Sequence, residues 1–157
     1  MKKVLKILSH IVLTLLFIGY IAYQFRTDPI EILTGRQVTG AEVSYPVDWT
    51  FADGYSTIAV ETRIGNPHSV TVICWIAGGK LHIPARDGAI KDWPSYVMTD
   101  NRVRLKVGDR VYPATLRRVV DADVAGLIAQ GAIKYPRFAQ APDDAVAATW
   151  IFEVNPR

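Results

Sequence analysis

The stretch from Ser69 to Pro84 constrains the fold more than any other part of the sequence. It reads SVTVICWIAGGKLHIP, so β-branched and aromatic residues lead to a glycine pair, after which apolar residues alternate. Gly78 and Gly79 can adopt the positive φ angles that a two-residue hairpin turn requires. The first strand is apolar at nearly every position after Thr71, which predicts a central strand covered on both faces. The sequence therefore predicts a β-hairpin at the centre of a closed barrel.

The other periodic segments predict four further strands and two short helices. In residues 57–63 apolar and polar side chains alternate, as in a strand with one solvent-exposed face. Residues 102–107 and 110–119 are predicted to form a second hairpin around Gly108-Asp109, and residues 149–154 a last, aromatic strand. About six strands without an internal repeat predict a mainly β domain, a small antiparallel barrel.

The two helices are expected between these strands. One covers residues 93–99 with Pro94 in its first turn, where a missing N–H does no harm. The other is capped by Asp121 or Asp123 and is expected to end at Gly131. Residues 134–144, which contain two prolines, are predicted to form a loop.

A charge-free run at residues 7–25 predicts a membrane anchor, because a helix of this length covers about the hydrocarbon thickness of a bilayer. A cleaved signal peptide is the rival interpretation, but Tyr20 is a poor fit two residues before the small residue Ala22. Three lysines precede the run and acidic residues soon follow it, so we expect a single-pass protein of the cell inner membrane with a cytoplasmic N-terminus and a periplasmic globular domain. The predicted domains are an anchor (residues 1–26), a tether and docked lead-in (27–53) and a barrel (54–157).

Charge and cysteine content exclude several classes of function. Three of the 18 basic residues are the N-terminal lysines, so the remaining 15 balance the 15 acidic residues and no basic stripe suggests a nucleic-acid partner. The single cysteine, Cys74, cannot form an intramolecular disulfide, and its apolar neighbours predict an inert core thiol. His68 and His82 have no carboxylate or cysteine at metal-ligand spacing, so no metal site is expected. His10, inside the apolar run, could ligate haem, contact another helix or reach the headgroups.

The order of these elements resembles the flavin-binding split-barrel group. A strand, a hairpin, a loop with lysine and tryptophan, a short helix and then DNRVRLKVGDRVY at residues 100–112 carry the resemblance, which covers residues 57–119 and the last strand. The group includes pyridoxamine-phosphate-oxidase-like and deazaflavin-dependent nitroreductase-like proteins, and the whole plan is similar to small membrane-anchored bacterial relatives. The resemblance implies a six-stranded antiparallel split β-barrel, a cofactor that is FMN or a deazaflavin, and a homodimer with the cofactor between its subunits.

The resemblance also implies where the flavin phosphate and ring would be held. The matching cofactor-binding positions are His68, Ser69, Thr71, Arg86, Lys91 and Trp93. Arg86 and Lys91 flank Gly88 and could bring positive charge and backbone N–H groups to a phosphate, or could belong to a solvated loop. Trp93 could stack beside the isoalloxazine ring or close the end of the barrel.

Two functions from different classes remain open. In the first, the chain is an oxidoreductase in which a bound flavin or deazaflavin passes electrons to a small or quinone-like acceptor near the membrane. In the second, it holds no cofactor and is an accessory or scaffolding subunit of a larger inner-membrane complex, with the barrel as its docking module. Membrane lipid is a partner in both, and a homodimer is compatible with both.

Overall fold

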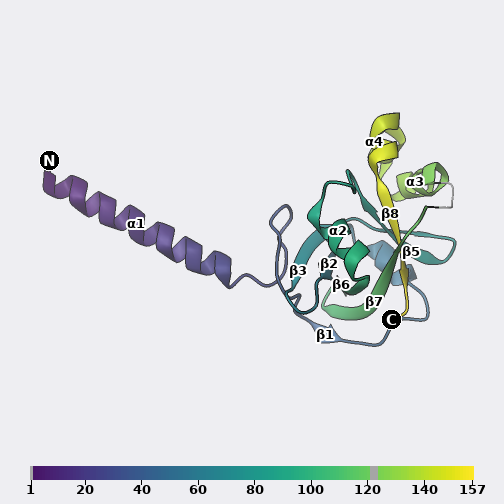
Figure 1. Ribbon diagram of the computed structural model, residues 1–157, viewed down its shortest axis with the longest axis horizontal. Coiled ribbons are helices and arrows are strands. Elements are labelled where there is room, and N and C mark those ends of the chain that lie inside the picture. The colour runs from purple at the N-terminus through teal and green to yellow at the C-terminus, as the bar shows by residue number, and fades with distance from the viewer. Residues whose placement is uncertain (1, 121–123) are drawn as a thin grey trace.

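The structure is a computed structural model that describes residues 2–120 and 124–157. A long helix, α1 (Lys2–Gln24), stands clear of a β-rich domain (Figure 1). By length and composition α1 could cross a membrane, and none of its apolar window is buried against the rest of the protein. The helix matches the apolar run that the sequence analysis identified.

The described part of the domain contains eight strands, two more than predicted. They are β1 (Ala41–Glu42), β2 (Ile58–Thr62), β3 (His68–Val72), β4 (Trp75–Ala77), β5 (Lys80–Ala85), β6 (Arg102–Val107), β7 (Arg110–Arg118) and β8 (Trp150–Asn155). The prediction of six strands is wrong for two reasons: the expected long hairpin strand is broken into β3 and β4, and the two residues of β1 are too few to show a period. The mainly β antiparallel architecture is confirmed.

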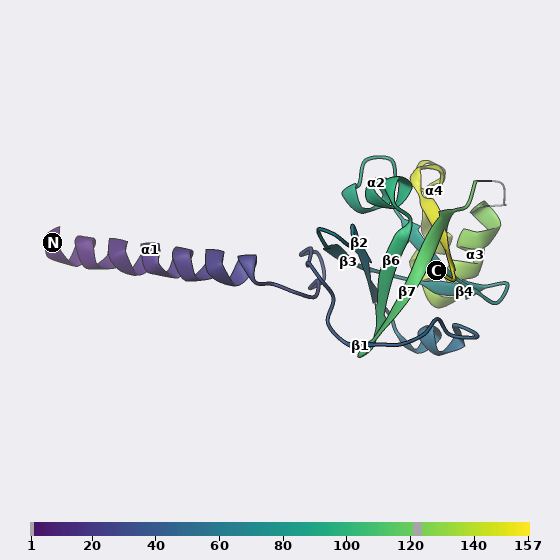
Figure 2. The ribbon, with the colours of Figure 1, turned by 60° about the horizontal axis from the view of Figure 1, so that its bottom comes forward.

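Short helices fill the remaining connections. They are the α-helices α2 (Asp92–Thr99), α3 (Val124–Lys134) and α4 (Asp143–Ala148) and the 3₁₀ helices η1 (Thr50–Gly54) and η2 (Pro136–Gln140). In Figure 2, α2 and α4 lie at one end of the domain and α3 lies along its side, while the chain that leads to β2 runs along the other end. The predicted loop at residues 134–144 is therefore largely helical, and the predicted caps Asp121 and Asp123 lie outside the described residues.

The strands form one sheet in the order β3-β2-β6-β7-β8-β5-β4, and β1 pairs in parallel with β7. All pairings along this order are antiparallel. Its two edge strands, β3 and β4, are consecutive in the chain and are joined only by Ile73-Cys74. The prediction of a central strand is thus wrong. Residues 68–77 supply both edge strands of the sheet and join them into a half-barrel.

Both predicted hairpin turns form where glycine permits them. Gly78 and Gly79 have φ angles of 56° and 77°, and Gly108 has a φ of 59°. By contrast, Gly131 does not end α3, which continues to Lys134. A Cβ at this position would lie 3.0 Å from the ring of Trp75, so this glycine allows the helix to pack closely against β4.

The outer face of β2 is buried, although the alternation of apolar and polar residues predicted that one face would be exposed to solvent. Ala59 packs there with Val38 and Val111, and Glu61 is 1% exposed. The Glu61 carboxylate accepts a hydrogen bond from the backbone N–H of Val38 at 2.7 Å and forms an ion pair with Arg104 at 3.0 Å. The lead-in therefore docks on the sheet and covers this face, because a buried carboxylate needs such partners.

We expect Glu61→Gln to lower the free energy of unfolding of the full chain by about 3 kcal/mol, because the change leaves Arg104 without its buried counter-charge. Urea unfolding in detergent micelles, followed by tryptophan fluorescence, measures this loss. Arg102→Gln, which removes the more exposed ion pair with Asp100, is the matched control and should leave the midpoint unchanged. Equal midpoints for the two variants would contradict the structural role of Glu61.

Candidate functional site

A cavity of about 890 Å³ lies between β3, the start of α2 and the segment from α3 to α4. Residues 31–34, from the lead-in, form a further wall. The floor is apolar and includes Val70, Val72 and Ile73, with Ile128 and Phe138 from the helical segment. A volume of this size lies within the range of small-molecule and cofactor sites.

Five of the six predicted cofactor-binding residues line this cavity. They are His68, Thr71, Arg86, Lys91 and Trp93. Ser69 does not line it: the side chain is fully buried beside Gly35, where an added Cβ would lie 2.5 Å from the serine Oγ. Ser69 and Gly35 also exchange backbone hydrogen bonds of 2.8 and 3.2 Å, so this serine fastens the lead-in to the edge of the sheet.

Trp93 closes one end of the barrel as well as lining the cavity. It is 5% exposed, belongs to the main core cluster, and its ring centroid lies 5.3 Å from that of Phe152. Pro94 follows it in the first turn of α2 and is buried too. The indole therefore offers the cavity a wall that core packing holds in place.

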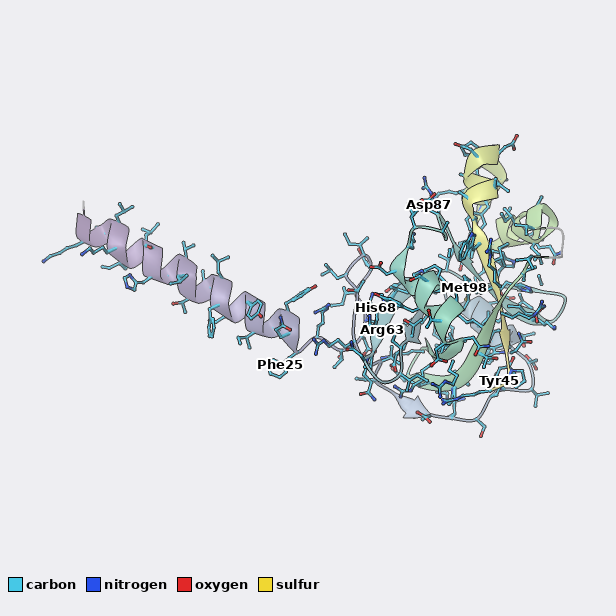
Figure 3. The ribbon with its side chains drawn as sticks, in the orientation of Figure 1. Phe25, Tyr45, Arg63, His68, Asp87 and Met98 are labelled. Carbon is cyan, nitrogen blue, oxygen red and sulfur yellow. The ribbon has the colours of Figure 1, made fainter. Side chains whose placement is uncertain are left out.

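His68, the first residue of β3, is the histidine that lines the cavity among the described residues. Its ring meets that of Tyr96 edge to face at 5.3 Å, and its Nδ1 is buried with no hydrogen-bond partner among the described residues. Burial, the largest cause, and the positive charge of Arg63 lower the pKa of His68, while Asp92 opposes the shift. Figure 3 shows His68 and Arg63 together on the side of the domain that faces α1. The imidazole is thus neutral at neutral pH and is free to hydrogen-bond to a ligand.

Three cations line the cavity from two segments. The Arg86 side chain is 77% exposed and lies 3.6 Å from the Asp87 carboxylate, a weak pairing. Within the described part of the chain, no carboxylate forms an ion pair with Lys91 or Arg137. Two carboxylates, Glu31 and Asp92, also line the cavity, so its charged residues are net positive by one. An apolar floor with such a cationic rim suits a flat ring that carries an anionic group.

Three charged residues that line this cavity were not predicted. Asp92 lies between the predicted residues Lys91 and Trp93, whereas Arg137 and Glu31 lie elsewhere in the chain. Both come from segments that the sequence assigned to a loop and a tether, and neither lies in a periodic pattern. No signal in the local sequence could have found them, because tertiary packing of η2 and of the lead-in brings them to β3.

The remaining candidates lie outside the cavity. Cys74 is fully buried, and burial raises the pKa of its thiol to about 11. His82 is 4% exposed, lies against Trp75 and has its Nδ1 3.0 Å from the carbonyl oxygen of Lys80. His10 is exposed on α1 with its Nδ1 2.7 Å from the Lys6 carbonyl oxygen. Among the described residues, no three histidine, cysteine or carboxylate side chains gather as a metal site would require.

No protein-family model matches the sequence, and a search of curated proteins finds no match. Solved structures match by fold. A candidate pyridoxamine 5′-phosphate oxidase from Listeria innocua has a TM-score of 0.52 at 12% identity, covering 68% of this chain and 87% of that chain. The haem storage protein HutZ from Vibrio cholerae has a TM-score of 0.51 at 14% identity, covering 68% and 85%. An F420-H2-dependent reductase has a TM-score of 0.50 at 19% identity, covering 64% and 94%.

These neighbours define the fold of the domain as that of the flavin-binding split-barrel group. The split-barrel fold that the resemblance predicted is therefore confirmed, although its strand count is not six. One of the neighbours is described as a haem storage protein, so the fold by itself does not identify the ligand.

The lowered pKa of His68 predicts how stability depends on pH. An unfolded histidine binds a proton more tightly than His68 does, so the contribution of His68 is complete above about pH 6.5 and is lost as the pH falls toward its lower folded-state pKa. We expect the free energy of unfolding of the full chain, relative to His68→Gln, to decrease between pH 7.5 and pH 5. His82 titrates in both proteins and cancels in the difference. An NMR titration midpoint of His68 above 6.5 would contradict this account.

Proposed function

We propose that this chain is a membrane-anchored protein whose split barrel binds FMN or a deazaflavin in the cavity beside β3. The observation that supports the proposal is the convergence of an apolar floor, a cationic rim and the neutral His68 on one cavity of about 890 Å³. Because these groups come from separate parts of the chain, the cavity is a product of the fold and not of one local motif. The fold neighbours include proteins described as a pyridoxamine 5′-phosphate oxidase and an F420-H2-dependent reductase.

The residues present fit such a cofactor. Arg86 and Lys91 would hold its phosphate, since both line the cavity and neither has a strong competing partner among the described residues. Val70 and Trp93 would contact the apolar ring, and the unpartnered Nδ1 of His68 is available for one of its polar atoms. The bound cofactor would supply the hydride or electron transfer, and the protein would bind it, orient it and exclude water. The acceptor in this proposal is a small or quinone-like molecule.

The location of the protein follows from α1. This helix would cross the cell inner membrane with its lysine-rich end in the cytoplasm, because positive residues are retained there, and the barrel would lie in the periplasm. In this arrangement residues 1–26 are the anchor, residues 27–53 the lead-in and residues 54–157 the barrel.

We further propose a homodimer in which a second copy covers the cavity. The rim is exposed and in part apolar: Ile90, next to Lys91, is 84% exposed. A second copy that packed over this rim would remove the isoleucine from water and would enclose the ligand.

The alternative function is that of an accessory subunit of a larger inner-membrane complex. The single helix α1 motivates it, because no part of the described chain buries its apolar window and the helix could lie against the membrane helices of a larger complex. Extraction in mild detergent followed by a native gel separates the two functions. An obligate subunit migrates with its complex, whereas a protein that always migrates alone, or as a homodimer, is not one.

Added FMN or F420 should bind the purified full chain in mild detergent, with a visible absorption band and quenched cofactor fluorescence. We expect Lys91→Glu and Arg86→Glu each to weaken binding roughly ten-fold or more, because each change removes a charge-assisted hydrogen bond and adds repulsion. Arg110→Glu, an exposed change outside this cavity, is the matched control and should bind like the wild type. Absence of binding at high micromolar cofactor would refute the proposal, and a Soret band would identify a haem site instead.

A further inference from the structure

The turn at residues 30–33 exposes more apolar surface than a water-soluble turn normally does. Ile30 is 68% exposed, Ile32 is 94% exposed and Leu33 is 55% exposed. Three large aliphatic side chains within four residues form a continuous apolar tip, whereas single exposed apolar residues are common on protein surfaces.

The turn is held in this shape by hydrogen bonds. The backbone N–H groups of Ile30 and Leu33 each donate to the carbonyl oxygen of the other residue, at 3.0 and 2.8 Å. At the base of the turn, the Nε of Arg26 donates to the carbonyl oxygen of Thr34 at 2.5 Å, and the N–H of Arg36 donates to that of Thr27 at 2.6 Å. The exposure of the aliphatic side chains is therefore fixed by the fold and does not result from a loose linker.

The turn projects on the side of the domain that faces α1, and Figures 1 and 2 both show it between the helix and β3. Four residues separate Phe25, which is 78% exposed and labelled at the end of the helix in Figure 3, from Ile30. Arg26 lies between them with its guanidinium 3.7 Å from the centre of the Tyr23 ring. Aromatic and basic residues of this kind are typical of the level of the lipid headgroups.

The charges near the turn do not oppose contact with lipid. Asp28 is neutralised by an ion pair with Lys106 at 2.9 Å. Glu31 is the one charged residue within the turn; it is exposed to water and, like Ile32 and Leu33, it lines the cavity. Each aliphatic side chain that leaves water is stabilised in proportion to the apolar area that it buries. Ile32, the most exposed of the three, has the most to gain.

We infer that residues 30–33 insert their apolar side chains into the membrane interface and form a second lipid contact beside α1. The inference rests on the proposed anchoring by α1. Because residues 31–34 are also a wall of the cavity, the cavity then lies next to the lipid surface. Its ligand or acceptor would belong to the class of amphipathic ring compounds that dissolve in the bilayer.

A fluorescent label at residue 32 tests the contact in the full chain. Ile32→Cys is labelled with an environment-sensitive nitrobenzoxadiazole dye and reconstituted into phosphatidylcholine–phosphatidylglycerol vesicles that contain lipids with a nitroxide near the headgroup. Ile133→Cys on α3, 86% exposed in the structure, is the matched control. Cys74 is fully buried, so the wild-type chain should take up no label and both variants should be labelled at one site. Leu33→Cys provides a second position in the turn.

We expect the nitroxide lipids to quench the dye at residues 32 and 33 several-fold more strongly than the dye at residue 133. Equal quenching at the three positions would overturn the inference, as would a blue-shifted dye at residue 32 that lipid nitroxides do not quench, because a protein partner would then cover the turn. Flotation of the labelled chain with the vesicles reports the anchoring by α1 separately. A chain that floats but fails to bind flavin would refute the proposed cofactor and leave the lipid contact intact.

Discussion

The link at Ile73-Cys74 is the constraint on which the rest of the domain depends. It joins β3 and β4, the two edges of a sheet whose strands are otherwise connected by hydrogen bonds, and thereby fixes how far the sheet can curl. The link is itself held in place: the Tyr135 hydroxyl accepts a hydrogen bond from the Cys74 N–H at 3.4 Å and lies 2.7 Å from the carbonyl oxygen of Ser56. Since the Cys74 side chain belongs to the main core, opening this link would expose the barrel interior to water.

The cavity exists because of this closure. Residues 70–73, which lead into the link, lie along its floor, and residues from the helical segment 128–149 line it after the chain has returned from β7. Packing of α3 against Trp75 depends on the missing side chain of Gly131, and Ile128 of the same helix lines the cavity. The cations and the apolar floor come together only when the sheet has closed and α3 has packed against it. The candidate binding site is therefore formed by the folded domain and by no single loop.

This dependence also separates what the sequence could predict from what it could not. The glycine turns, the pairing of residues 102–107 with 110–119, the helix at α2 and the final aromatic strand are local features, and all of them form as expected. The break at Ile73-Cys74 cannot be predicted from the sequence, because apolar residues occur both in central strands and in buried bends. Likewise Glu61 in an alternating strand looks solvent-exposed until Val38 and Arg104, from distant parts of the chain, are found beside it. For the cavity, the resemblance to split barrels led to five lining residues, whereas Arg137 and Glu31 came only from tertiary packing.

The lead-in, residues 27–53, restricts how the barrel is oriented relative to α1. A flexible linker rich in glycine and serine would let the barrel take many orientations. Here Asp28 pairs with Lys106, Val38 donates to buried Glu61, and Ser69 and Gly35 bond across the sheet edge, so the chain is fastened to the barrel within a few residues of α1. If any one of these contacts is removed, the others still hold the segment. Together they restrict its movement relative to the sheet. Ion pairs and hydrogen bonds to β2, β3 and β6 consequently fix the lead-in, which supplies residues 31–34 to the cavity wall.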